Sequence, residues 1–261
     1  MTRVSWHSTP PGVRPHVPET GIDREEAETV LDFSSRKALT FDCYGTLIDW
    51  EAGILAALRP ILDRYRAALD DDRLLELYAR HEPDAQRGGY RAYRDVLGSV
   101  VEGIGRELGF TASPDETASL ADSIADWEPF PDTVEALRKL KKRFKLGIIS
   151  NIDDDLFAGS ARRLEVGFDW IVTAQQVRSY KPSINNFERA LERIDLPADA
   201  IAHVAQSLFH DVVPARELGI ATVWVNRGGA RPGSGATPAA VARPDLEVPD
   251  LAALVSTIGI D

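Results

Sequence analysis

The chain of 261 residues contains a single cysteine, Cys43, so no intrachain disulfide can form. A protein without disulfides fits a reducing compartment, and we expect a cytoplasmic location. Basic residues are also few, since 30 Lys and Arg stand against 41 Asp and Glu, a formal net charge of −11. Because nucleic acids are bound by clustered Lys and Arg, this balance argues against a nucleic-acid partner. It leaves small anions open as ligands, because these need only a few local cations.

Long apolar runs are absent as well. No segment approaches the length of a membrane span, so we expect no membrane partner. The first residues, MTRVSWHSTPPGVRPHVPETG, contain no apolar core of a secretory signal. Their four prolines predict a flexible N-terminal tail over residues 1–33.

Short apolar runs alternate with helical patterns in much of the chain. Strands are predicted at 37–42, 145–149, 169–173, 201–205 and 220–225, with helices such as 132–143 and 184–193 between them. This alternation predicts an α/β fold with a doubly wound parallel sheet, a Rossmann-like core formed by residues 34–52 and 129–261. Residues 53–128 interrupt it with helical patterns alone and are predicted to be a helical insertion. Residues 228–245, rich in Gly, Pro and Ala, are predicted to form a loop.

Polar side chains follow several of the predicted strands. Ligands of open parallel sheets bind beyond the carboxyl ends of the strands, so these side chains are the candidates for chemistry. They are Asp42, Ser150, Asn151, Gln206, Ser207, His210 and Asp211, with Lys181 in a loop. Two carboxylates, hydroxyls, an amide and an amine at one opening are typical of a hydrolase that uses a carboxylate nucleophile.

Four segments carry a resemblance to a known family. FDCYGTLIDW at 41–50, SNIDDDL at 150–156, YKPSINNF at 180–187 and AQSLFHDVVPARELGI at 205–220 resemble the four ordered motifs of the haloacid dehalogenase superfamily. The inserted helices resemble the cap domain of that superfamily.

The resemblance implies roles for three ionisable residues. Asp42 corresponds to the nucleophile; without the other motifs, it would be interpreted as a turn-capping residue at a strand end. Lys181 corresponds to the lysine that offsets the charge of the nucleophile and of a bound anion. Asp211 corresponds to the final carboxylate, which ligates Mg²⁺ in the phosphatases and positions the lysine or the hydrolytic water in the dehalogenases.

Tyr44 decides the subfamily. Phosphatases of this superfamily carry a second Asp two positions after the nucleophile, where it protonates the leaving alkoxide. A halide leaves without a proton, so a dehalogenase can do without that acid. An aromatic residue there resembles the type II (S)-2-haloacid dehalogenases, in which case Tyr44 lines the substrate pocket; packing in the core is compatible with that role.

The remaining site residues are predicted to bind substrate. Thr46 is expected to hydrogen-bond the Asp42 carboxylate or the substrate, unless it only starts a helix. Ser150 and Asn151 lie where the family binds the anionic group, although a strand-to-helix cap is their alternative. Gln206 and Ser207 complete this set, and His210 is a second-rank candidate base. Cys43 is expected to pack in the core.

The cap should supply a cation for the substrate's carboxylate. Arg80 is the best match for this clamp, because the fork of an arginine suits a carboxylate, and Arg73, Arg87 and Arg91 are alternatives. Arg80 could instead be an ordinary solvated arginine on the surface. The chain departs from the dehalogenase pattern at Phe187, where that pattern has an aromatic hydroxyl.

The sequence therefore predicts a hydrolase that forms an ester on Asp42. The expected reaction is dehalogenation of a small 2-haloalkanoic acid, or a related C–X or ring-opening hydrolysis of a small carboxylic acid. A Mg-dependent phosphatase and a non-catalytic protein that binds small anions are the alternatives. Because Tyr44 and Gln206 are not acidic, no required metal or cofactor is predicted, with Mg²⁺ needed only by a phosphatase. A homodimer is left open.

Overall fold

The computed structural model describes residues 31–228, 236–237 and 240–260. Most of the predicted N-terminal tail lies outside these residues. The core is a parallel sheet of six strands in the order β3-β2-β1-β4-β5-β6. Its strands are β1 (Ala38–Phe41), β2 (Lys145–Ser150), β3 (Trp170–Thr173), β4 (Ile201–Ala205), β5 (Ala221–Val225) and β6 (Leu246–Val248).

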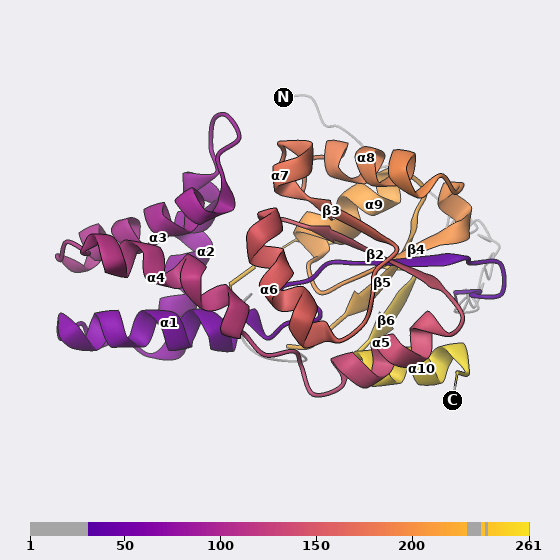
Figure 1. The fold of residues 1–261 in the computed structure, drawn as a ribbon, viewed down its shortest axis with the longest axis horizontal. Coiled ribbons are helices and arrows are strands. Elements are labelled where there is room, and N and C mark those ends of the chain that lie inside the picture. Colours follow the sequence, from indigo (N-terminus) through magenta and orange to yellow (C-terminus); the bar gives the residue numbers. More distant parts are fainter. Residues whose placement is uncertain (1–30, 229–235, 238–239, 261) are drawn as a thin grey trace, which may run out of the picture.

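Helices cover both faces of the sheet, which confirms the predicted fold class (Figure 1). Apolar side chains of α5, α6 and α10 pack on one face, and those of α8 and α9 on the other. The core helices are α5 (Thr133–Lys141), α6 (Asp154–Leu164), α7 (Ala174–Val177), α8 (Asn185–Ile194), α9 (Val213–Glu217) and α10 (Leu251–Ile258). Strands buried on both faces are short apolar runs, which is why the sequence revealed β1, β2, β4 and β5. The edge strand β3 was also predicted, and β6 was missed.

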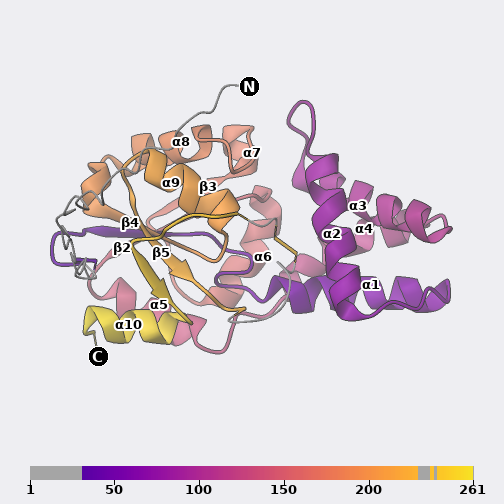
Figure 2. The ribbon, with the colours of Figure 1, turned by 180° about the vertical axis from the view of Figure 1, so that it is seen from behind.

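Four further helices form a separate group at one end of the molecule (Figures 1 and 2). They are α1 (Trp50–Arg64), α2 (Asp71–Ala85), α3 (Tyr93–Leu108) and α4 (Pro114–Ser123). We call this group the cap. Its helices lie between β1 and β2 in the chain, and α1 begins before residue 53, the predicted start of the insertion. Side chains of Asp49 and Ser113 cap α1 and α4, which explains why the helices start where they do.

The strand order creates the place for a site. The chain connects β1 to β2 on one side of β1, whereas β4 lies on the other side, so the carboxyl ends of β1 and β4 flank a crevice. The cap lies beyond these ends. Within the part of the chain that the structure describes, no helix is long and apolar enough to cross a membrane.

Candidate active site

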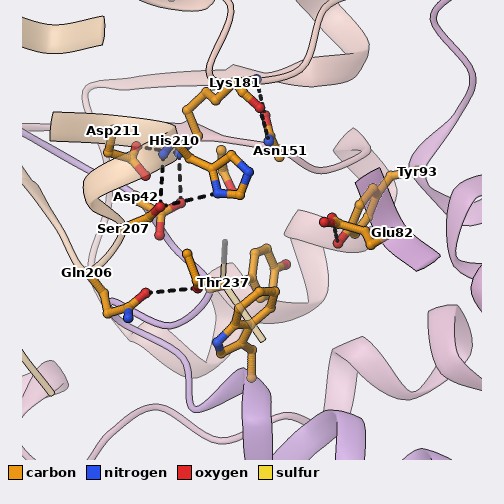
Figure 3. Close-up of a pocket in the computed structure, with 13 residues that line it drawn as sticks. Asp42, Glu82, Tyr93, Asn151, Lys181, Gln206, Ser207, His210, Asp211 and Thr237 are labelled. Atoms are coloured by element: carbon orange, nitrogen blue, oxygen red, sulfur yellow. Dashed lines mark hydrogen bonds and ion pairs between the residues drawn. The ribbon is translucent and has the colours of Figure 1, made fainter. Parts of the chain in front are cut away.

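One pocket collects polar side chains from several strand ends, and cap residues close its other side (Figure 3). Its enclosed space is small, about 40 Å³. It suits a compact ligand. Most of the predicted site residues line it: Asp42, Tyr44, Ser150, Asn151, Lys181, Gln206, Ser207 and Asp211, together with His210.

Lys181 lies between two carboxylates. Its Nζ donates to Asp42 Oδ1 at 2.9 Å, to Asp211 Oδ1 at 2.6 Å and to the carbonyl oxygen of Ile149 at 2.8 Å. The side chains of all three ionisable residues are buried. An ammonium group has three N–H donors, so Lys181 has none left for a ligand. Its role here is to compensate the two buried carboxylates.

The three charges set one another's ionisation. Burial raises the pKa of Asp42 and the Asp211 charge raises it further, whereas Lys181 lowers it. Burial also acts to raise the pKa of Asp211, but Lys181 and His203 outweigh it and bring this pKa to about 2. Burial lowers the pKa of Lys181, yet the two carboxylates raise it on balance. Asp211 and Lys181 are therefore charged at neutral pH, and the ionised form of Asp42 depends on Lys181.

Thr46 holds the second oxygen of Asp42. Its hydroxyl donates to Asp42 Oδ2 at 2.9 Å and accepts from the backbone N–H of Gln206 at 2.9 Å. Thr46 thus links the ends of β1 and β4. The turn that follows β1 needs Gly45, whose φ is 88° and where a Cβ would lie 2.9 Å from Trp50 Nε1.

His203 supports Asp211 from below the site and was not predicted. Its Nε2 lies 2.9 Å from Asp211 Oδ1, and its Nδ1 lies 2.9 Å from Thr40 Oγ1. The arrangement fits an Nε2–H that donates to Asp211 and an Nδ1 that accepts from the threonine hydroxyl. Phe187 packs edge-on against this imidazole, with ring centroids 5.0 Å apart. The sequence signal was a histidine inside the apolar run IAHVA.

Ser150 and Asn151, predicted as a pair, do different things. Asn151 donates from Nδ2 to the carbonyl oxygen of Lys181 at 3.0 Å and accepts from its N–H at 2.7 Å. It therefore positions the lysine loop. The buried hydroxyl of Ser150 has no hydrogen-bond partner among the described residues, and neither has Oδ2 of Asp211. Buried polar atoms are rarely left unpaired, so both atoms fit contacts with a ligand or water in the pocket.

Three other predicted residues are engaged with their neighbours. Ser207 accepts from the backbone N–H of His210 at 2.9 Å, and its hydroxyl lies 3.2 Å from Nδ1 of that histidine. Burial lowers the pKa of His210 to about 4, so the imidazole is neutral at pH 7. Gln206 accepts from Thr237 at 3.3 Å. Tyr44 hydrogen-bonds Ser160 of α6 at 2.9 Å, so its hydroxyl is engaged in the core.

The prediction that Arg80 clamps the substrate is wrong in this structure. Arg80 is 47% exposed and pairs with Glu107 of α3 at 2.9 Å, away from the pocket. The buried face of α2 carries Tyr78, and a position two residues later lies about 160° away around the helix. The three alternatives, Arg73, Arg87 and Arg91, are bonded elsewhere and do not line the pocket either.

Accordingly, we expect Arg80→Lys to leave kcat/KM for a carboxylate substrate within about twofold of the wild type. The substitution weakens only an exposed ion pair, which contributes up to about 1 kcal/mol to stability. Steady-state kinetics with a 2-haloalkanoic acid test this expectation. A tenfold rise in KM, with an unchanged melting temperature, would return Arg80 to the site.

The residues present do not fit a magnesium site. Among the described residues, no group of three or more His, Cys, Asp and Glu side chains could hold a metal ion. The Lys181 ammonium already contacts both Asp42 and Asp211, so these two carboxylates are compensated by a residue of the chain itself.

Comparisons with known proteins identify the family of the chain. A family model described as haloacid dehalogenase-like hydrolase matches residues 36–219. The (S)-2-haloacid dehalogenase of Pseudomonas sp. strain YL is 30% identical over 226 residues, which cover 84% of this chain and 93% of that protein. The (S)-2-haloacid dehalogenase H-109 of Pseudomonas putida is 24% identical over 202 residues, 74% of this chain and 87% of that protein.

Solved structures show the same fold. The L-2-haloacid dehalogenase from Xanthobacter autotrophicus with chloropropionic acid covalently bound superposes with a TM-score of 0.70 at 21% identity, over 85% of this chain and 98% of that one. The extent of the family match and the 30% identity together settle the family. The chain is an enzyme of the haloacid dehalogenase-like hydrolase family.

Proposed function

We propose that the protein hydrolyses a small 2-haloalkanoic acid through a covalent ester on Asp42. The observation that carries this proposal is a carboxylate at the end of β1 that faces a small pocket and is fixed by Lys181 and Thr46. A carboxylate held in this way is oriented for attack on a tetrahedral carbon. The similarity to (S)-2-haloacid dehalogenases supports the substrate class.

The reaction has two steps. In the first, an oxygen of Asp42 bonds to the carbon that carries the halogen, and the halide leaves with the bonding electron pair. In the second, water attacks the Asp42 carbonyl carbon and releases the hydroxy acid. Asp211 Oδ2, buried and without a partner among the described residues, is available to accept a hydrogen bond from that water. Lys181 stabilises the charge that returns to Asp42.

The pocket also offers a donor for the substrate's carboxylate. The unpaired hydroxyl of Ser150 is buried at the end of β2, so it can donate to a ligand oxygen. A phosphatase reaction finds less support here. It would need an acid at position 44 to protonate the leaving alkoxide, but the Tyr44 hydroxyl is bonded to Ser160 in the core.

Single-turnover hydrolysis in ¹⁸O-labelled water tests the ester. With enzyme in excess over 2-chloropropionate, we expect the label to enter the Asp42 carboxylate and the product to carry an unlabelled hydroxyl. The peptide that contains Asp42 is then analysed by mass spectrometry. Label in the product of the first turnover would mean that water attacks the substrate directly, and Asp42 would then be a general base.

A further inference from the structure

The cap side of the pocket presents a carboxyl group where the sequence predicted a cation. Glu82, on α2, is 5% exposed and lines the pocket with Tyr93 of α3. Figure 3 shows this pair on the opposite side of the pocket from Asp42, Lys181 and Asp211. Nothing in the proposed dehalogenation uses a second carboxyl group here.

Glu82 is held by one of its two oxygens. Its Oε1 accepts from the Tyr93 hydroxyl at 3.0 Å and from Gln86 Nε2 at 2.9 Å. The Tyr93 hydroxyl in turn lies 3.0 Å from that of Tyr78, so the contacts continue into the interior of the cap. Among the described residues, no hydrogen bond to Oε2 is found. One oxygen fixes the group, and the other is free for a ligand.

No cation faces this carboxyl group from the described elements around it. Tyr78 and Tyr93 approach it from α2 and α3, and Tyr180 from the core. Across the pocket, Lys181 is the one cation among the described lining residues, and its three N–H donors are already engaged. The other ionisable groups on that side are Asp42, Asp211 and His210. Burial therefore raises the pKa of Glu82 to about 7, against the lowering by Tyr93 and Gln86. Much of Glu82 keeps its proton at neutral pH.

Glu82 lies across the pocket from Asp42, on the side towards which a leaving group would depart. A nucleophile displaces a group from a tetrahedral carbon along the line opposite to its attack, so the group displaced by Asp42 departs towards the cap. A halide there needs no proton. An oxygen leaving group does, and a carboxylic acid within reach can supply it.

We propose that Glu82 is a general acid contributed by the cap, and that the site, besides displacing halide, opens the C–O bond of small strained cyclic ethers that carry a carboxylate. This inference rests on the proposed nucleophilic role of Asp42. The step balances with groups that the site holds. An Asp42 oxygen bonds to the ring carbon, the ring C–O bond breaks, and its electron pair takes the Glu82 proton to form a hydroxyl. Water then cleaves the ester, and the proton it releases restores Glu82.

The test compares two substrates of nearly equal size, oxirane-2-carboxylate and 2-chloropropionate. Glu82→Gln keeps the shape and the hydrogen bonds of the side chain but cannot supply an acidic proton. We expect it to lower the ratio of kcat for the oxirane to kcat for the chloride by at least about 100-fold. Glu76→Gln is the matched control, because Glu76 lies on the same helix with a 60% exposed side chain. It should leave the ratio within about twofold.

A pH profile of the wild type tests the same idea without a variant. Because the acid must be protonated, kcat for the oxirane should fall as the pH rises above about 7, the pKa of Glu82. The chloride reaction should lack this decline, and Glu82→Gln should lose it.

Three results overturn the proposal: no oxirane hydrolysis by the wild type, an equal loss for both substrates in Glu82→Gln, or a change confined to KM. The last would make Glu82 a binding group. None of these results contradicts the nucleophilic role of Asp42. That role is contradicted only if Asp42→Asn still hydrolyses 2-chloropropionate. The two proposals therefore fail separately.

Discussion

Asp42→Asn is expected to lower kcat for a 2-haloalkanoic acid by about 10⁴-fold or more, since the loss of a catalytic nucleophile has effects of this size. An amide does not attack a tetrahedral carbon at a useful rate. It also cannot accept from both donors of the carboxylate, because Lys181 donates to one oxygen and Thr46 to the other. The introduced amide therefore presents its NH₂ group to one of them.

The same substitution should leave the protein folded. Removal of the Asp42 charge leaves Lys181 paired with Asp211, so no buried charge loses its last partner. Asp126→Asn, at an 84% exposed side chain, is a suitable control for the loss of one carboxylate. Circular dichroism should show similar melting of both variants. Mass spectrometry must confirm that the introduced asparagine has not deamidated to aspartate. Activity near that of the wild type, with the amide intact, would place the nucleophile elsewhere.

The sequence predicted the core of the site because its residues lie at strand ends and in recognisable motifs. Asp42, Lys181 and Asp211 are far apart in the chain, yet the parallel sheet brings them to the same edge. β6 was missed because it has three residues at the edge of the sheet, too few to form an apolar run. The helices between β1 and β2, in contrast, are long enough to give a recognisable helical pattern in the sequence.

The cap residues of the site were harder to predict because no motif marks them. The available signal was helical spacing: Leu74, Tyr78 and Glu82 recur every four residues and are all buried. An acidic residue on the buried face of an amphipathic helix needs an explanation, whereas Arg80 was chosen for its chemistry alone. The choice considered charge but not the face of the helix on which the residue lies, and it gave Arg80, which is outside the pocket. The helical spacing of the buried residues would have pointed to Glu82.

Lys181→Met should have the largest effect on stability. The side chain of Lys181 is 2% exposed, and its ammonium group compensates two buried carboxylates, Asp42 and Asp211. Removing one partner from a buried set of charges typically costs about 3–5 kcal/mol, because the charges that remain have no water to solvate them. We expect a loss of this size in the free energy of unfolding at pH 7.5, measured by urea denaturation. Lys145→Met, at a 65% exposed side chain that contacts Asp169, should cost at most about 1 kcal/mol.

The pH dependence separates this mechanism from a simple packing defect. In the wild type, Asp211 has a pKa of about 2, below the ordinary aspartate value of 3.8, so its contribution to stability is present above pH 3.8 and is lost as the pH falls towards 2. Without Lys181, burial and mutual repulsion raise the carboxylate pKa values above 3.8, so the folded variant binds more protons than its unfolded chain. The stability of the variant then rises as the pH falls. The difference in the free energy of unfolding between wild type and variant should therefore be smaller at pH 5 than at pH 7.5.

Adding Asp211→Asn to Lys181→Met should restore part of the lost stability without restoring activity. If Lys181→Met lost the same free energy of unfolding at both pH values, or no more than Lys145→Met loses, Lys181 would not compensate these two carboxylates.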